Sequence, residues 1–289
     1  MNSFKDGWFS EHSTLWPGQC FSLAVSKVLH QEKSAFQDIL VFQNEQYGRV
    51  LVLDGVIQLT EKDEASYQEM MAFLPITSHP NPEKVVLIVG GGDGGVAREV
   101  IKDPRVKSVT VCEIDPRVPE VCKEFFPTLS SSFSEGKVKL RVGDGSEYLA
   151  SFQDEFDVII TDSSDPIGPA ACLFEEAYFQ RLQRALKPGG IFCSQGESMW
   201  IHMKIIQETM KLARQFFPTV SYATTNTPTY PCGQIGFLLG SKSVETDFKT
   251  PAWKMSKGEV CAMQLKYYTP EVHAAAFVLP AFAQKLLSD

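Results

Sequence analysis

The stretch that decides the fold reads Val85-Val86-Leu87-Ile88-Val89 and continues at once as Gly90-Gly91-Gly92-Asp93-Gly94-Gly95. Residues 85–89 form an apolar run typical of a buried strand, and residues 96–100 are expected to open a helix. A strand that enters a helix through a glycine turn is how a Rossmann-like sheet holds an adenosine ligand. Asp93, inside the turn, would repel the pyrophosphate of a dinucleotide and attract a cation. The turn therefore indicates an adenosine ligand with a positively charged tail.

Strands and helices alternate along the chain after this turn. The pattern predicts further strands at 108–112, 138–142, 156–160, 191–194, 220–223 and 235–239, and helices near 175–186 and 199–215. Such alternation implies parallel strands with helices on both faces of the sheet. The expected fold class is therefore α/β, with a Rossmann-like parallel-sheet core.

The first 60 residues or so predict antiparallel β-structure instead. Strands are expected within 20–30 and at 38–42, 48–53 and 56–59. Asp54-Gly55, between the last two, is a strong signal for a hairpin turn. Thr60 is expected to cap a helix, and Pro75 to end or kink it. These features place a small N-terminal antiparallel β-strand domain at residues 1–62 and a Rossmann-like catalytic domain at 63–289.

The composition limits the classes of function. The 289 residues carry a formal charge of −8, which disfavours nucleic acid as a partner because phosphate binding needs a basic surface. The seven cysteines are scattered, and neither they nor the five histidines show metal-ligand spacing, so His202 is interpreted as a surface or packing residue. The sequence shows no signal peptide and no apolar run of roughly 20 residues, so a cytoplasmic location without membrane association is expected.

Acidic residues follow the predicted strands, and ligands of open α/β sheets bind beyond the carboxyl ends of their strands. These residues are Asp93, Glu113, Asp115, Asp144, Asp162, Asp165 and Glu197. No Lys or Arg lies within 90–95, 143–149, 161–174 or 195–198. Like charges raise one another's pKa, and a bound cation would relieve that cost. Single members of the set could instead cap helices, and Asp115, before Pro116, is expected to do so.

Two of these acids suit an adenosine ligand in particular. Glu113 lies 20 residues after Asp93, at the end of the second strand of the core, where an acidic residue takes the ribose hydroxyls. Asp144-Gly145, after the third strand, suits the adenine amino group, because the carboxylate accepts a hydrogen bond and the glycine lets the backbone approach the ring.

An ordered set of motifs resembles the polyamine aminopropyltransferases and covers almost the whole chain. The motifs are the glycine turn, Glu113-Ile114-Asp115, Gly143-Asp144-Gly145, Asp162-Ser163-Ser164-Asp165-Pro166 and Pro228-Thr229-Tyr230-Pro231-Cys232-Gly233. Earlier matches are Trp16-Pro17-Gly18-Gln19, Tyr47-Gly48, Leu53-Asp54-Gly55-Val56-Ile57-Gln58 and Ser66-Tyr67-Gln68-Glu69. The glycine turn alone is a weak signal, whereas the ordered set is highly specific.

The resemblance implies a methyltransferase-type core, a homodimer and no metal or redox cofactor. It implies transfer of the aminopropyl group of decarboxylated S-adenosylmethionine, a co-substrate, to putrescine, giving spermidine and 5′-methylthioadenosine. The nucleoside would be held by Gln37, Gln58, Glu113, Asp144 and Gly145. The two amine-bearing chains would be held by Tyr67, Gln68, Asp93, Asp162, Asp165 and Tyr230.

The chemistry of these residue types suits that reaction. A primary amine has a pKa of about 10, so Asp162 is the expected general base that takes its proton, with Tyr67 and Tyr230 orienting it. Asp165 would act on the acceptor by charge. Asp93 would attract an aminopropyl ammonium and oppose the carboxylate of ordinary S-adenosylmethionine. Residues 166–176 could form a mobile gate over the site.

Other functions remain open at this point. A putrescine N-methyltransferase would keep much of the same motif set, and a regulatory nucleoside-binding paralogue would be expected to lack an acid or a tyrosine of the site. Spermine synthase typically carries a longer N-terminal extension than this sequence shows. A nicotinamide-dependent oxidoreductase is disfavoured because Asp93 would repel its cofactor.

Overall fold

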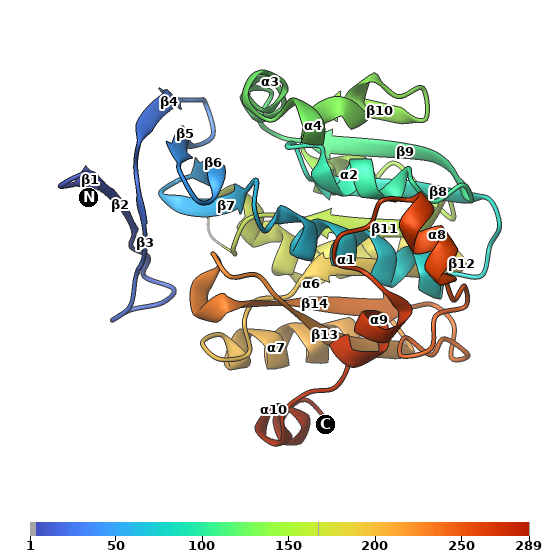
Figure 1. Ribbon diagram of the computed structural model, residues 1–289. Coiled ribbons are helices and arrows are strands. Elements are labelled where there is room, and N and C mark those ends of the chain that lie inside the picture. The colour runs from blue at the N-terminus through green and yellow to red at the C-terminus, as the bar shows by residue number, and fades with distance from the viewer. Residues whose placement is uncertain (1–3, 167, 289) are drawn as a thin grey trace.

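Two small antiparallel sheets begin the chain in the computed structural model, which describes residues 4–166 and 168–288 (Figure 1). The first contains β1 (Phe4–Lys5), β2 (Trp8–Glu11) and β3 (Phe21–Ala24), and the second β4 (Lys27–Lys33), β5 (Asp38–Asn44), β6 (Gly48–Leu53) and β7 (Val56–Thr60). The predicted antiparallel character is confirmed. The hairpin at Asp54-Gly55 is also confirmed, with both residues at positive φ, 48° and 81°.

A seven-stranded sheet forms the core of the molecule. Its strands are β8 (Lys84–Gly90), β9 (Val106–Glu113), β10 (Val138–Val142), β11 (Phe156–Asp162), β12 (Leu186–Gln195), β13 (Thr219–Asn226) and β14 (Gln234–Ser241), in the order β10-β9-β8-β11-β12-β14-β13. The neighbouring strands β10, β9, β8, β11 and β12 pair in parallel, as predicted. The expectation of parallel strands is wrong for β14, which runs antiparallel to both neighbours. The connection from β13 to β14 is too short for a crossover, so these strands form a hairpin.

Helices cover both faces of this sheet. They are α1 (Glu64–Ser78), α2 (Gly95–Val100), α3 (Arg117–Phe125), α4 (Pro127–Ser130), α5 (Gly145–Leu149), α6 (Glu176–Ala185), α7 (Met203–Ala213), α8 (Lys257–Ala262), α9 (Pro270–Ala276) and α10 (Ala281–Leu287). Val86 and Ile88 of β8 pack in the cluster that includes α1 and α2, whereas Leu87 and Val89 pack in the cluster that includes α6 and α7. This alternation follows from the two-residue period of a strand and buries both faces.

Helix α1 lies across one face of the sheet, and all of its residues are buried (Figure 1). Its start was predicted wrongly, because Thr60 ends β7 and Asp63 occupies the N-cap position. Nor does the helix end at Pro75, since it continues to Ser78. Pro75 lies in the last turn, where the hydroxyls of Thr77 and Ser78 donate back to the carbonyls of Phe73 and Leu74.

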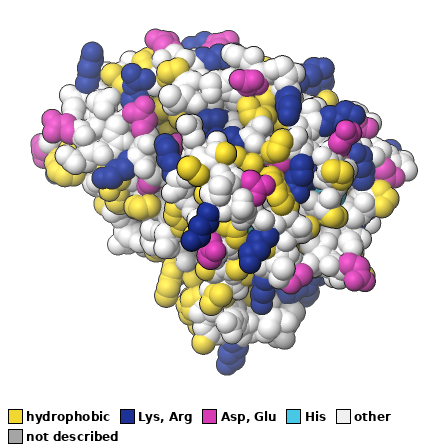
Figure 2. Space-filling model, turned by 45° about the vertical axis from the view of Figure 1, so that its right-hand side comes forward, with side chains coloured by type: hydrophobic (Ala, Val, Ile, Leu, Met, Phe, Trp, Pro, Cys, Tyr) yellow, Lys and Arg dark blue, Asp and Glu magenta, His cyan; other side chains and the backbone are white. Residues whose placement is uncertain are grey.

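Two later helices are shorter than the sequence suggested. Helix α6 stops at Ala185, because Leu186 already belongs to β12, and α7 spans only Met203–Ala213. No helix among the described residues has the length and apolar character needed to cross a bilayer. The face shown in Figure 2 carries acidic and basic side chains interspersed, so the acidic excess does not gather on it.

Candidate active site

A cavity of about 190 Å³ opens where β8, β9 and β11 end, under strands β6 and β7 of the N-terminal sheet. Every site residue expected from the sequence lines it: Gln37, Gln58, Tyr67, Gln68, Asp93, Glu113, Asp144, Gly145, Asp162, Asp165 and Tyr230. Within the described residues, no Lys or Arg belongs to the lining. The cavity is thus an acidic pocket with apolar walls such as Leu51 and Val89.

Glu113 ends β9 and reaches back to the glycine turn. The backbone N–H of Gly92 donates to Oε2 at 3.1 Å, and that of Asp115 donates to Oε1 at 2.9 Å. A Cβ atom at position 92 would lie 2.7 Å from Oε2, so only glycine leaves room for the carboxylate. Burial raises the pKa of Glu113 to about 7, although both hydrogen bonds oppose the shift.

Asp115 does not join the lining of the cavity. Its Oδ1 accepts a hydrogen bond at 3.0 Å from the backbone N–H of Arg117, the first residue of α3. Its Oδ2 accepts from Ser34 Oγ at 2.7 Å and from Gln37 Nε2 at 2.9 Å. The expected N-cap position is wrong by one residue, because Pro116 occupies the N-cap of α3, and no side-chain cap is present there. The Asp115 carboxylate fixes the amide of Gln37 at the pocket wall.

Asp144 lines the cavity and also caps a helix. Its Oδ1 accepts from the backbone N–H groups of Ser146 and Glu147 at 2.8 and 3.1 Å, at the start of α5. Neither hydrogen bond uses Oδ2, which leaves that oxygen for a ligand. Gly145 follows directly as the first residue of α5.

Asp162 ends β11, and the hydroxyl of Tyr67 on α1 donates to its Oδ1 at 2.7 Å. Burial raises the pKa of Asp162, and the neighbouring Asp93 and Glu113 carboxylates raise it further, while the Tyr67 hydrogen bond opposes them. Burial and the Asp162 charge likewise raise the pKa of the Tyr67 phenol. The phenol therefore stays protonated and acts as a donor.

Asp93 occupies the turn between β8 and α2. Its Oδ1 accepts from the Gly95 backbone N–H at 2.6 Å and from Gln68 Nε2 at 3.3 Å. Burial raises the pKa of Asp93, and the Gly95 hydrogen bond opposes that shift. The carboxylate thus accepts a hydrogen bond from the first residue of α2 and also lines the pocket, so its structural and binding roles are compatible.

Tyr230 closes the pocket from the loop between β13 and β14. Its hydroxyl donates to the backbone carbonyl of Gln58 at 2.6 Å, and its ring centroid lies 5.7 Å from that of Tyr67. The preceding residue, Thr229, donates from its backbone N–H and its hydroxyl to Asp63 Oδ2, at 3.0 and 2.8 Å. These contacts tie the loop to the beginning of α1.

The sequence interpretation missed His202 as part of this site. It is buried rather than on the surface, it lines the cavity, and its Nδ1 lies 2.5 Å from Glu197 Oε2. Its Nε2 contacts the Leu15 carbonyl at 3.0 Å, and its ring lies near that of Trp16. No local pattern could reveal the contact with Leu15, because the two residues are 187 positions apart.

The expected mobile gate at 166–176 stays a prediction. Ile167 lies outside the described residues, and Gly168–Phe174 form a 3₁₀ helix. Ala170 and Cys172 of this helix line the cavity.

The arrangement suits a cationic ligand attached to an adenosine. Carboxylates with raised pKa values gather with no Lys or Arg in the described part of the lining, so a positive charge would stabilise their ionised forms. Asp162 also has the environment of a general base, with a pKa moved toward neutrality and a fixed phenol donor on one oxygen.

Comparisons with known proteins agree with this geometry. A family model described as "Spermine/spermidine synthase domain" matches residues 64–250, and one described as "Spermidine synthase tetramerisation domain" matches residues 7–61. The chain is 54% identical to a spermidine synthase of Dictyostelium discoideum over the full length of both. It is 52% identical to one of Schizosaccharomyces pombe, over 98% of this chain and 94% of the relative. A crystal structure of spermidine synthase with the transition state analogue AdoDATO superposes with a TM-score of 0.91 and 34% identity, covering 99% and 96% of the two chains.

Proposed function

This chain belongs to the spermine/spermidine synthase family, and from that premise we propose how its pocket carries out the family's reaction. The protein is an aminopropyltransferase that moves the aminopropyl group of decarboxylated S-adenosylmethionine to putrescine, giving spermidine and 5′-methylthioadenosine. The observation that carries the proposed roles is the Asp162–Tyr67 pair, which lies beside Asp93 in an acidic cavity.

The nucleoside half of the co-substrate is assigned to one wall of the cavity. Glu113 accepts hydrogen bonds from the ribose hydroxyls, and Asp144 with Gly145 receives the adenine. Gln37 and Gln58 complete this wall. Support comes from the shared cavity, and from Oδ2 of Asp144, which the helix cap leaves for a ligand.

The aminopropyl chain of the co-substrate is assigned to Asp93 and Gln68. Both hydrogen bonds that Asp93 accepts go to Oδ1, which leaves Oδ2 for an ammonium group. The same carboxylate would repel the carboxylate of ordinary S-adenosylmethionine. Selection against the commoner nucleoside therefore rests on repulsion as well as attraction. This preference also argues against the N-methyltransferase alternative.

The acceptor amine is assigned to Tyr67, Asp162, Asp165 and Tyr230. Asp162 takes a proton from the putrescine ammonium, and the free amine attacks the methylene carbon next to the sulfonium. A carbon–nitrogen bond forms as the carbon–sulfur bond breaks, and the neutral thioether leaves with the electron pair. The two tyrosines orient the amine, and holding both substrates in line supplies much of the acceleration.

The assembly and location of the protein are also proposals. We assign the antiparallel strands of residues 1–62 to an assembly domain and residues 63–289 to catalysis. The match of residues 7–61 to a tetramerisation domain supports an oligomer, for which a homodimer is the simplest form. We place the protein in the cytoplasm.

Asp162→Asn tests the base assignment. Turnover should fall by about 10²- to 10⁴-fold, the usual contribution of a general base, while the affinity for 5′-methylthioadenosine changes little. Asp157→Asn is the matched control, because Asp157 lies near the other end of β11 and outside the cavity lining. Near-normal turnover of Asp162→Asn would remove Asp162 from the mechanism.

A further inference from the structure

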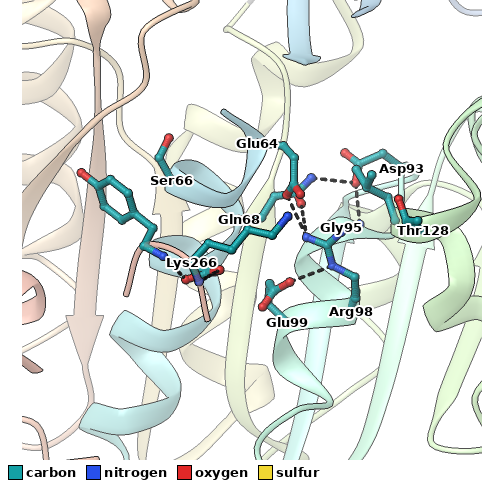
Figure 3. A network of polar contacts seen from close by, with 12 residues as sticks. Glu64, Ser66, Gln68, Asp93, Gly95, Arg98, Glu99, Thr128 and Lys266 are labelled. Atoms are coloured by element: carbon teal, nitrogen blue, oxygen red, sulfur yellow. Dashed lines mark hydrogen bonds and ion pairs between the residues drawn. The ribbon is translucent and has the colours of Figure 1, made fainter. Parts of the chain in front are cut away.

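A network of charged side chains lies beside the glycine turn (Figure 3). Glu64 and Gln68 of this network line the cavity, whereas Arg98, Glu99 and Lys102 lie outside the lining. Arg98 of α2 donates from one terminal nitrogen to Glu64 Oε2 at 2.8 Å and to Gln68 Oε1 at 3.2 Å. Its Nε donates to Glu99 Oε1 at 2.7 Å, and Lys102 pairs with the other oxygen of Glu99 at 2.6 Å. One guanidinium therefore joins α1 to α2 directly behind Gln68.

The chemistry of Arg98 fixes which end of the Gln68 amide faces the pocket. A guanidinium has only donors, so the Gln68 atom beside it must be the carbonyl oxygen. The Nε2 group must then point the other way, where it donates to Asp93 Oδ1 at 3.3 Å. A reversed amide would place two donors together at Arg98 and two acceptors together at Asp93.

The glycine turn holds the amide in this place by close packing. A Cβ atom at position 95 would overlap the amide of Gln68, so the amide rests directly on Gly95. The backbone N–H of that same glycine donates to Asp93. Gly95 thus brings the amide and the carboxylate together, and Arg98 decides how the amide is turned.

We propose that Arg98 is a positioning residue for the aminopropyl chain of the nucleoside substrate: it orients the Gln68 amide so that the Asp93 carboxylate is held in place to receive the ammonium group. The inference rests on the proposed role of Asp93. Arg98 itself is outside the cavity lining and acts through Gln68. Its effect belongs to the aminopropyl end of the ligand and leaves the ribose and adenine contacts alone.

Two ligands distinguish a positioning role of Arg98 from a general loss of folded protein. Decarboxylated S-adenosylmethionine has the aminopropyl chain, and 5′-methylthioadenosine lacks it. The affinity for the first ligand divided by the affinity for the second is therefore unaffected by any loss of folded protein. Arg98→Lys keeps the charge but not the fork that reaches three partners. We expect decarboxylated S-adenosylmethionine to bind about tenfold more weakly to the variant, which corresponds to about 1.4 kcal/mol. The affinity for 5′-methylthioadenosine should change by less than about twofold.

Lys102→Gln is the matched control, because it breaks the ion pair with Glu99 without touching Gln68, and its ratio should equal that of the wild type. Gln68→Ala should lower the ratio of the two affinities, as Arg98→Lys does. If Arg98→Lys does not fold, Gln68→Ala still tests the proposal. The double variant should be no worse than Gln68→Ala alone, because the two residues act in series.

Three outcomes would overturn the inference. They are an unchanged ratio in Gln68→Ala, equal losses for both ligands in Arg98→Lys, or additive effects in the double variant. Asp93→Asn tells this failure from failure of the proposed function. If Asp93→Asn lowers the ratio and Arg98→Lys does not, only the positioning role fails. If Asp93→Asn also leaves the ratio unchanged, the binding role of Asp93 fails as well.

Discussion

The stability of Glu113→Gln relative to wild type should rise with pH, and the variant should bind the nucleoside more weakly. Glu113 is buried in the cavity wall, and burial raises its pKa from 4.5 to about 7. The unfolded chain releases this proton near pH 4.5, whereas the folded protein keeps it until about pH 7. The stability contributed by this group is therefore fully present below pH 4.5 and is lost as the pH rises through 7. Glutamine has no charge at any pH, so the variant does not lose this stability as the pH rises.

The size of the effect follows from the shift. One pKa unit corresponds to 1.36 kcal/mol, so a shift of this size costs about 3 kcal/mol of unfolding free energy at pH 8. The cost is about 2 kcal/mol at pH 6 and falls below about 0.5 kcal/mol at pH 4.5. The unfolding free energy of Glu113→Gln relative to wild type should therefore rise with pH by these amounts.

Urea denaturation of wild type and variant at these three pH values measures the difference. Asp157→Asn is a control for which we expect the opposite change in unfolding free energy. Burial of Asp157 is outweighed by its hydrogen bonds to Lys187, the Val85 backbone N–H and Asn81, so its pKa is lowered. A lowered pKa stabilises the fold above pH 4, and this variant should lose stability there.

A difference in unfolding free energy between Glu113→Gln and wild type that is the same at every pH would refute the reasoning, because such a difference would come from packing and hydrogen bonding and not from charge. Titration with 5′-methylthioadenosine at pH 8, without urea, should show weaker binding to the variant, since the ribose hydroxyls lose an ionised acceptor.

The remaining expectations concern the buried contacts of the C-terminal segment. Burial lowers the pKa of His273 to about 4, so stability should fall by up to about 3 kcal/mol as the pH drops from 6.5 through 4. Nuclear magnetic resonance should show this imidazole neutral at pH 5.5, and titration near pH 6.5 would contradict the burial argument. Glu69 accepts the backbone N–H groups of residues 266–268 at 2.8 to 2.9 Å. Glu69→Gln should lower the free energy of unfolding by about 2 kcal/mol and speed proteolysis near these residues. An unchanged cleavage rate would contradict the view that Glu69 holds residues 266–268 in place.

Much of the core could be predicted because its signals are local. Apolar runs locate the parallel strands, and residues at their carboxyl ends must meet at one edge of the sheet. That rule is enough to bring Asp93, Glu113 and Asp162 into one cavity. The direction of β14 was missed because alternation of elements says nothing about a final hairpin.

Contacts between distant segments could not be predicted from the sequence. The contact of His202 with the Leu15 carbonyl depends on how the N-terminal segment folds over the sheet. The role of Arg98 depends on the packing of α1 against α2. Helix α1 was expected, but burial on every side removes the polar face from which its ends would be recognised.

That complete burial also determines how α1 exchanges its amide hydrogens with solvent. All of its residues are buried, so we expect its slowest amides to exchange only when the whole molecule unfolds. A ligand that binds the folded state alone adds RT ln(1 + [L]/Kd) to that unfolding free energy. Deuterium uptake by every such amide of α1 should therefore slow by the same factor when the ligand is added. The exchange rate of this helix then reports the affinity for a ligand without any measurement of enzyme activity.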